Sequence, residues 1–237
     1  MPRPTRPLVF IVIVAVTSLT LSTVAYARSP SVSSVIKTVK AAVRKESGAQ
    51  LVAIEQSASS SQVAKETLNA GTTSGQETFS KGQADFTIKV TPTDAYISGS
   101  SSGLTTILGM SATDAKKIGS DWVYWKHGTT EYADLKSGLT VSSLTSVFPK
   151  VKGTTLSTRS TKGVILYVLR WTSAATSSAP KLSETLTVST KTDLPVRSTA
   201  TTSGGTKVAT TFSDWGKRVL VSAPPSRSTV PSSKITG

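Results

Sequence analysis

The chain has 237 residues, with 27 Lys or Arg against 13 Asp or Glu, which gives a formal net charge of +14. It contains no cysteine, which excludes disulfides, so burial of apolar side chains and sheet hydrogen bonding must hold the fold. Such a basic surface favours anionic partners, for example lipid headgroups, an anionic membrane surface or a cell-wall polymer. Serine and threonine make up about a third of the chain, and threonine in this abundance favours strands.

The first 27 residues have the three parts of a secretory signal peptide. Two arginines make the start basic, an unbroken apolar run covers residues 8–16, and Ala25-Tyr26-Ala27 places small residues before a cleavage site. We expect cleavage between Ala27 and Arg28, with residues 28–30 as a short linker. The alternative is an uncleaved membrane anchor, but the strongly apolar core is shorter than the ~20 residues that span a bilayer.

Both interpretations place the rest of the chain outside the cytoplasm, extracellular or associated with the cell envelope. Nucleic acid is then not an expected partner. A diacylglycerol anchor needs a cysteine at the first mature position, where this chain has Arg28. The protein is therefore not expected to be lipid-anchored through cysteine. Residues 31–222 are long enough for one domain with its own core.

The mature chain opens with an amphipathic helix. Apolar side chains recur at helical spacing, with lysines and arginines off that stripe and Gly48 as the stop; the stripe consists of Val32, Val35, Ile36, Val39 and Val43. A basic amphipathic helix can lie on a membrane. This stripe is aliphatic and lacks Trp and Phe, which favours a helix packed on the body of the domain.

Beyond Gly48 the hydrophobic period changes to two, which predicts strands. Residues 51–57 and 64–68 are weak candidates, whereas 85–90 alternates clearly and a Pro-Thr-Asp turn leads to 95–98, as in a hairpin. An apolar segment, 104–110, is bounded by glycine.

Two short helices are expected in the middle of the chain. Ser111-Ala112-Thr113-Asp114 has the form of a capping box and opens a helix that Gly119 closes. The strand 121–126 follows, and residues 140–148 form the second short helix, which Pro149 ends.

The second half is predicted to be strand after strand. Residues 164–171 are apolar at both parities, as expected of a strand covered on both faces, and residues 182–189 alternate. Further strands are expected at 196–202, 207–212 and 218–221, followed by a disordered Pro/Ser/Thr-rich tail over 223–237. The fold class is therefore α+β, with a large curved antiparallel sheet of about ten strands, the N-terminal helix and two short inserted helices over the concave face.

Such a sheet has one apolar face and too few helical residues to cover it fully. A curved sheet that is only partly filled leaves an apolar concavity, where a lipid-like ligand could bind. Strand parity and the apolar segment give the candidate lining residues, which are Phe86, Ile88, Val90, Leu186 and Val188 on strands, with Leu104, Ile107 and Leu108 near the opening.

Four stretches in order resemble the LppX/LprG group of actinobacterial cell-envelope proteins, which share a half-barrel fold with the LolA-type lipoprotein carriers. They are SATDAKKIGSDWV (111–123), LTVSSL (139–144), TDLPVR (192–197) and FSDWGKRVLVSAPP (212–225). With the opening helix they span nearly the whole mature chain. The resemblance implies a monomeric, non-catalytic carrier that shields the acyl chains of an envelope lipid or lipoprotein. The chain departs from the group in lacking the lipobox cysteine. A non-catalytic module that binds another protein on the same fold is the alternative.

Catalytic and metal sites are not indicated. His127 is the only histidine, and although Asp121 or Asp134 and a serine could nominally complete a triad, serine is too abundant for this to carry weight. An exposed histidine in a turn is the simpler interpretation. One histidine, no cysteine and dispersed acids offer no metal-ligand spacing, so neither metal nor cofactor is expected. The aromatic residues near 122–125, at 171 and at 215 are expected to pack in the core or line the mouth of a cavity.

Overall fold

The structure, a computed structural model, describes residues 30–174 and 181–235. The expected signal segment, its cleavage site between Ala27 and Arg28, and residues 236–237 lie outside the described residues.

The described residues form a large sheet and a few helices. The strands are β1 (Gly48–Gln56), β2 (Val63–Gly71), β3 (Gly75–Lys81), β4 (Ala84–Val90), β5 (Asp94–Gly99), β6 (Trp122–Lys126), β7 (Thr155–Thr161), β8 (Val164–Ser173), β9 (Leu182–Ser189), β10 (Pro195–Thr202), β11 (Lys207–Ser213) and β12 (Thr229–Pro231). The helices are α1 (Val32–Lys45), α2 (Ala112–Ile118) and α3 (Thr130–Gly138), with a π-helix η1 (Gly103–Ile107) and 3-10 helices η2 (Val141–Val147), η3 (Ser226–Ser228) and η4 (Ser232–Lys234).

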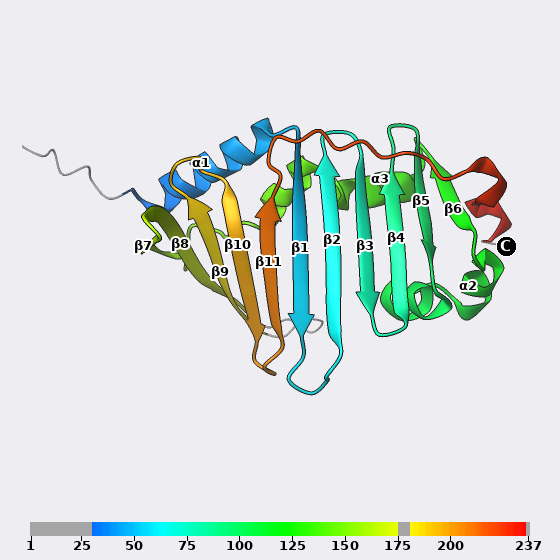
Figure 1. The fold of residues 1–237 in the computed structure, drawn as a ribbon, viewed down its shortest axis with the longest axis horizontal. Helices are drawn as coiled ribbons and strands as arrows, with labels where there is room; N and C mark the ends of the chain where they lie inside the picture. The colour runs from blue at the N-terminus through cyan, green and yellow to red at the C-terminus, as the bar shows by residue number, and fades with distance from the viewer. Residues whose placement is uncertain (1–29, 175–180, 236–237) are drawn as a thin grey trace, which may run out of the picture.

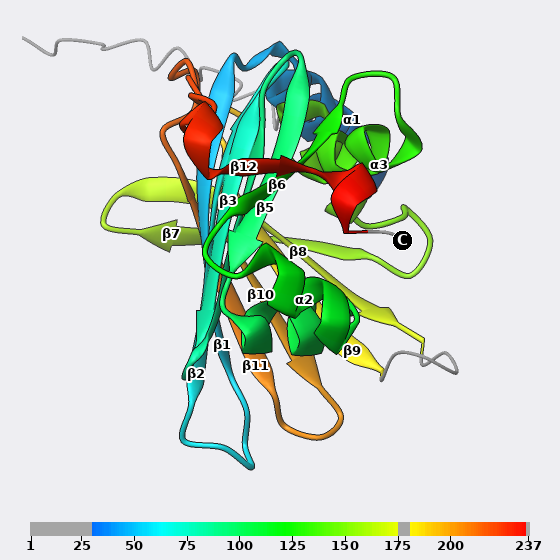
Figure 2. The same cartoon turned by 90° about the vertical axis from the view of Figure 1, so that its right-hand side faces the viewer.

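All twelve strands belong to one sheet, in the order β12-β6-β5-β4-β3-β2-β1-β11-β10-β9-β8-β7. The sheet curves without closing, and α1, α2 and α3 lie on its concave side (Figures 1 and 2). Neighbouring strands are antiparallel except β12 and β6, which are parallel. The predicted α+β half-barrel is thus confirmed.

The opening helix forms where its hydrophobic stripe predicts. The Ser31 hydroxyl accepts a hydrogen bond from the Ser34 N–H and caps the N-terminus, and two basic residues in the last turn suit the helix dipole. Val35, Ile36, Val39 and Val43 are buried, so the helix packs on the body of the domain as expected.

The capping box is also confirmed. The Ser111 hydroxyl accepts from the Asp114 N–H at 3.0 Å, and Gly119 ends α2 with φ of +58°. The helix expected at 140–148 is the 3-10 helix η2, which Pro149 follows. The helix α3 was not predicted, because its nine residues are mostly polar and only Tyr132 is buried.

Two predictions for the strands are wrong. Residues 218–221 do not pair with a strand. The strand β8 is not covered on both faces along its length, because Val164 and Ile165 at its start are 50% and 55% exposed. Beyond the expected set, the sheet includes β3 and the edge strand β7.

Residues 226–234 form secondary structure, where a disordered tail over 223–237 was expected. From β11 the chain crosses the convex side near the upper strand ends and reaches β6 (Figure 1). There Thr229, Val230 and Pro231 pair with Trp122, Val123 and Tyr124. Ile235 is buried, and its carbonyl accepts from Lys117 Nζ at 2.9 Å. The prediction of disorder failed because strand pairing and one buried side chain hold a segment that lacks a hydrophobic pattern.

Candidate functional site

The candidate lining residues belong to the covered part of the concave face. Side chains that oppose each other in register share a face, and one row across the sheet runs through Phe212, Leu51, Leu68, Glu77, Ile88, Ile97 and Val123. Six of the eight predicted residues are buried in one core cluster with α1 and η2, namely Phe86, Ile88, Val90, Leu104, Leu186 and Val188. Leu108 packs against this cluster, and Ile107 is 39% exposed.

Open space on the concave face lies instead over β8 to β11. A small hollow of about 100 Å³ is lined by Trp171, Leu186, Ala200 and Phe212, with polar groups from Glu184 and Thr210. Of the eight candidates, only Leu186 contributes to it. The other seven do not line this hollow and stay predicted ligand contacts.

A larger hollow of about 540 Å³ adjoins the small one. The loop after η2 forms its outer wall with Phe148, Lys150 and Lys152, and β8 and β9 form its floor. Trp171 and Glu184 line both hollows, so we treat the two as one site, the concave cleft. Alternation from Leu182 could have placed Glu184 inward, but no signal marked the loop as a wall.

The four strand glutamates all project from the concave face. Glu55, Glu66, Glu77 and Glu184 share register rows with inward residues, whereas the two strand aspartates lie near strand ends on the other face. Basic side chains on the convex face include Lys65, Lys89, Arg170, Arg197 and Lys207. The net positive charge is therefore unevenly distributed between the two faces.

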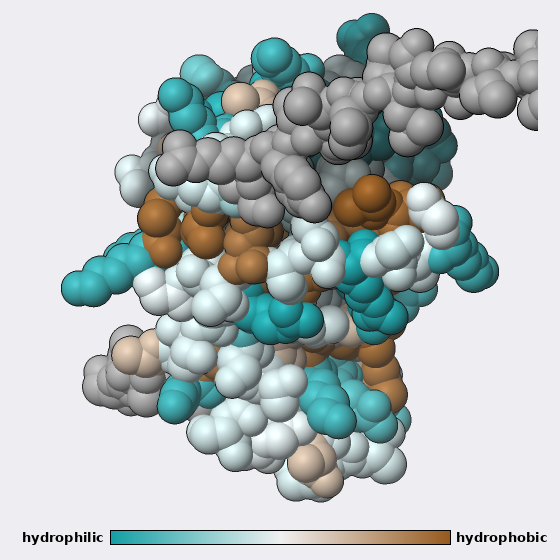
Figure 3. All heavy atoms as spheres, turned by 90° about the vertical axis from the view of Figure 1, so that its left-hand side faces the viewer, coloured by the Kyte–Doolittle hydropathy of each residue, from teal (hydrophilic) through white to brown (hydrophobic). Residues whose placement is uncertain are grey.

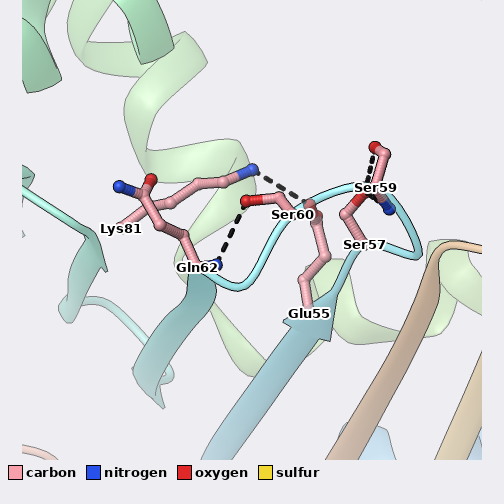
Figure 4. Close-up of polar contacts among 6 residues, drawn as sticks. All are labelled: Glu55, Ser57, Ser59, Ser60, Gln62 and Lys81. Carbon is pink, nitrogen blue, oxygen red and sulfur yellow. Dashed lines mark hydrogen bonds and ion pairs between the residues drawn. The ribbon is translucent and has the colours of Figure 1, made fainter.

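At the lower rim of the concave face, Lys81 Nζ lies 3.4 Å from Glu55 Oε1. Figure 4 shows this pair beside the turn between β1 and β2, where the Gln62 N–H donates to Ser60 Oγ. Both side chains of the pair are partly exposed, so its contribution to stability is small, at about 0–1 kcal/mol.

Glu66 and Glu77 have no such partner among the described residues. Burial raises the pKa of Glu66. Burial, and then the charge of Glu66, raises the pKa of Glu77 to about 7. Between these strands the concave floor thus carries carboxyls that are costly to ionise.

Glu184 differs, since its Oε2 accepts a hydrogen bond of 2.5 Å from the Ser173 hydroxyl. Across the cleft, Lys150 and Lys152 are exposed. Their ammonium groups give the outer rim a positive charge next to the apolar surfaces of Trp171 and Phe148.

His127 lies exposed in the turn between β6 and α3, as expected. Its ring meets that of Tyr132 edge to face at 5.0 Å, and it makes no side-chain hydrogen bond or ion pair with Asp121 or Asp134 in the described part of the chain. No group of three or more His, Cys, Asp or Glu that could hold a metal ion occurs in residues 30–174 and 181–235.

The aromatic residues divide between the faces. Trp125 packs against the core, and Lys89 Nζ lies 4.9 Å from the ring centroid of Trp122 on the convex face. Trp215 stacks on Phe212 and donates its Nε1–H to the Pro195 carbonyl. Of the tryptophans, Trp171 is the one that lines the concave cleft.

No family model and no curated protein matches the sequence. Among solved structures, the chain is similar to LprF from Mycobacterium bovis, with 13% identity, a TM-score of 0.49, and coverage of 81% of this chain and 96% of that one. It is also similar to a LolA-superfamily protein from Nitrosomonas europaea, with 9% identity, a TM-score of 0.31, and coverage of 81% and 96%.

A third similar structure is MucB, solved in complex with MucA from Pseudomonas aeruginosa, with 14% identity and a TM-score of 0.39. The match covers 80% of this chain and 58% of the other chain. These likenesses concern the fold alone. Among the described helices, none is long and apolar enough to cross a membrane.

Proposed function

We propose that this protein is an exported, non-catalytic lipid-binding protein that carries or presents an envelope lipid with an acyl chain in the concave cleft. The observation that supports this most directly is the pair of adjoining hollows. Trp171 lines both, apolar side chains line the inner one together with polar groups from Glu184 and Thr210, and two lysines edge the outer one. An amphiphile has this division into an apolar chain and a polar headgroup.

The size and chemistry of the cleft fit such a ligand. The outer hollow lies within the ~300–1,000 Å³ range of ligand pockets, and each buried CH₂ contributes about 0.8 kcal/mol. Lys150 and Lys152 would attract an anionic headgroup, and salt would weaken that part of the binding. The inner hollow is much smaller, so a chain that reaches Val188 has to displace side chains of the core.

Binding of a fluorescent fatty acid to the purified protein tests this function. Ala200 and Ala209 form a matched pair, because Ala200 faces the concave cleft and Ala209 on the next strand faces the convex side. Ala200→Phe fills the small hollow and should weaken binding at least tenfold, whereas Ala209→Phe should leave it unchanged. Replacing Lys150 and Lys152 by Ser should remove most of the salt dependence. Equal effects of the two alanine variants, or no binding of any apolar probe, would overturn the carrier function.

One observation favours the alternative, a module that binds another protein. Within the part of the chain that the structure describes, β7 pairs only with β8, so its outer edge has no partner strand there. The start of β8 beside it exposes Val164 and Ile165, and hydrophobic side chains interrupt the polar surface on this side (Figure 3). Such an edge can accept an extended peptide as an added strand. Native mass spectrometry after purification from the native host distinguishes the two functions, because a co-purified lipid supports the carrier and a co-purified polypeptide supports the module.

A further inference from the structure

A separate hollow of about 260 Å³ lies on the convex face, at the upper ends of β1, β2 and β3. Its floor is formed by Gln50, Asn69 and Gln76, and its wall by residues 217–221, which cross the convex side of the sheet (Figure 1). We call this wall the strap and the space beneath it the convex hollow. It faces away from the concave cleft and shares no residue with it.

The floor is a row of carboxamides on three adjacent strands. Gln50 pairs in register with Asn69, and Asn69 with Gln76, so neighbouring side chains start about 4.8 Å apart. Gln50 Nε2 donates to Asn69 Oδ1 at 2.9 Å. This bond leaves the side-chain carbonyl of Gln50 and the side-chain NH₂ group of Asn69 available, and the side-chain amide of Gln76 makes no hydrogen bond with another described residue.

Two hydrogen bonds hold the strap, one just before its first residue and one at its middle residue, Val219. The Gly216 N–H donates to the Gly48 carbonyl at 2.9 Å, and the Ser74 hydroxyl donates to the Val219 carbonyl at 3.1 Å. The backbone groups of Arg218, between these points, and of Leu220 and Val221, after them, have no hydrogen-bond partner among the described residues. Floor and wall thus both offer unpaired donors and acceptors, which need water or a ligand.

The charge of the convex hollow is nearly balanced at its mouth. Lys217 Nζ lies 2.6 Å from Asp214 Oδ1, which leaves Arg218 as the cation without an ion pair among the described residues. Leu220 at the rim is 77% exposed. A phosphate-rich ligand would meet few free cations here, and an acyl chain would desolvate the amides without replacing their hydrogen bonds.

A sugar ring meets all of these requirements. Its hydroxyls both donate and accept, as carboxamides and peptide groups do, and its C–H face can pack against an exposed aliphatic side chain. The volume is slightly below that of pockets for drug-sized ligands, which fits one ring. We propose that the convex hollow is a carbohydrate site that binds one sugar unit of a neutral glycan, independently of the lipid function proposed for the other face.

The test is a titration of the purified protein with chitotetraose, mannotetraose and maltotetraose, followed by NMR of side-chain NH₂ signals. At least one of these should shift the signals of Gln50, Asn69 and Gln76 and leave those of other amides in place. Gln76→Ala should weaken binding roughly fivefold, the effect of one lost hydrogen bond. Gln56→Ala is the matched control, because Gln56 lies exposed on the same face at the far end of β1.

If both variants have the same melting temperature as the parent protein, the weaker binding of Gln76→Ala is a local effect and not a result of unfolding. The proposal is overturned if no tetrasaccharide at about 10 mM, a concentration that detects weak binding, shifts the three amides. It is also overturned if Gln56→Ala weakens binding as much as Gln76→Ala. Failure here leaves the fatty-acid experiment unaffected, because the two sites lie on opposite faces.

Discussion

The Glu77 carboxyl on β3 lies diagonally across from Glu66 on β2, on the concave face and next to Leu68, which is the register partner of Glu77. Neither carboxyl group has a hydrogen bond or a counterion among the described residues. This arrangement raises the pKa of Glu77 to about 7, through burial first and the charge of Glu66 second.

The raised pKa predicts a pH-dependent stability. The pKa of Glu77 is 4.5 without these effects, so between that value and about 7 the folded state binds more protons than the unfolded state, and stability falls as pH rises. Glu77→Gln should therefore raise the free energy of unfolding at pH 8 by about 2 kcal/mol and have little effect at pH 4. Urea denaturation at both pH values checks this. Glu131→Gln, at an exposed site on α3, should lack the pH dependence.

The packing of α1 on the sheet can be tested by placing a charged side chain on its buried or on its exposed side. Val39 is 1% exposed, so Val39→Asp buries an unpaired carboxylate and should cost several kcal/mol, on the order of 3 or more. Lys37→Asp introduces the same group on the exposed side of the helix and should change stability by less than about 0.5 kcal/mol. Similar melting temperatures for the two variants would mean that α1 is not docked.

The strap depends on a glycine beneath it. A Cβ added at Gly48 would lie only 1.9 Å from the Lys217 carbonyl oxygen, which is a severe steric clash. Gly48→Ala must therefore push the strap away from the sheet. We expect a loss of about 2 kcal/mol or more and faster proteolysis after Lys217. Gly138→Ala meets no atom within 4 Å and should be neutral or slightly stabilising, by about 0.5 kcal/mol. Equal protease resistance of the two variants would contradict the contact.

The contribution of the Ser111 N-cap of α2 to the stability of the protein can be measured. Ser111→Ala removes the acceptor for the Asp114 N–H and should cost about 1 kcal/mol. Thr113→Ala, at an exposed site inside the same helix, removes no cap and replaces a poor helix former by the best one. Chemical denaturation should therefore give Thr113→Ala a free energy of unfolding equal to or above that of the parent protein, and Ser111→Ala a lower one.

N-terminal sequencing of protein recovered from the culture medium checks the export prediction. The n-, h- and c-regions of the first 27 residues predict a mature chain that begins at Arg28. A membrane-retained chain that begins at Met1 or Pro2 would indicate an anchor instead.

The sequence predicts those elements whose hydrophobic pattern matches their burial. The stripe of α1 and the alternation in β4 and β9 are of this kind, and they lead to the half-barrel. The strand β3 was missed because it places Glu77 on the inward face, where a pattern search expects an apolar residue. The strand β7 was missed because its side chains are mostly exposed.

The site was harder to predict than the fold, for a physical reason. Strand parity identifies which side chains face inward, but it does not tell which of them other elements cover. Ile88 and Leu186 both face inward and are both buried in the core, yet of the two only Leu186 also lines the small hollow. That difference depends on where α1, η2 and the loop at 148–154 lie, and only the tertiary structure fixes their places.

The pairing of β12 with β6 has a consequence for the order in which the sheet can be completed. Chains are synthesised from the N-terminus, so β6 emerges more than a hundred residues before Thr229–Pro231, the segment that pairs with its outer edge. During that interval β6 presents unpaired backbone groups, which invite association with other chains. This edge of the sheet is thus completed after the other strands have been made, and a chain that stops before Thr229 would leave β6 without this partner strand.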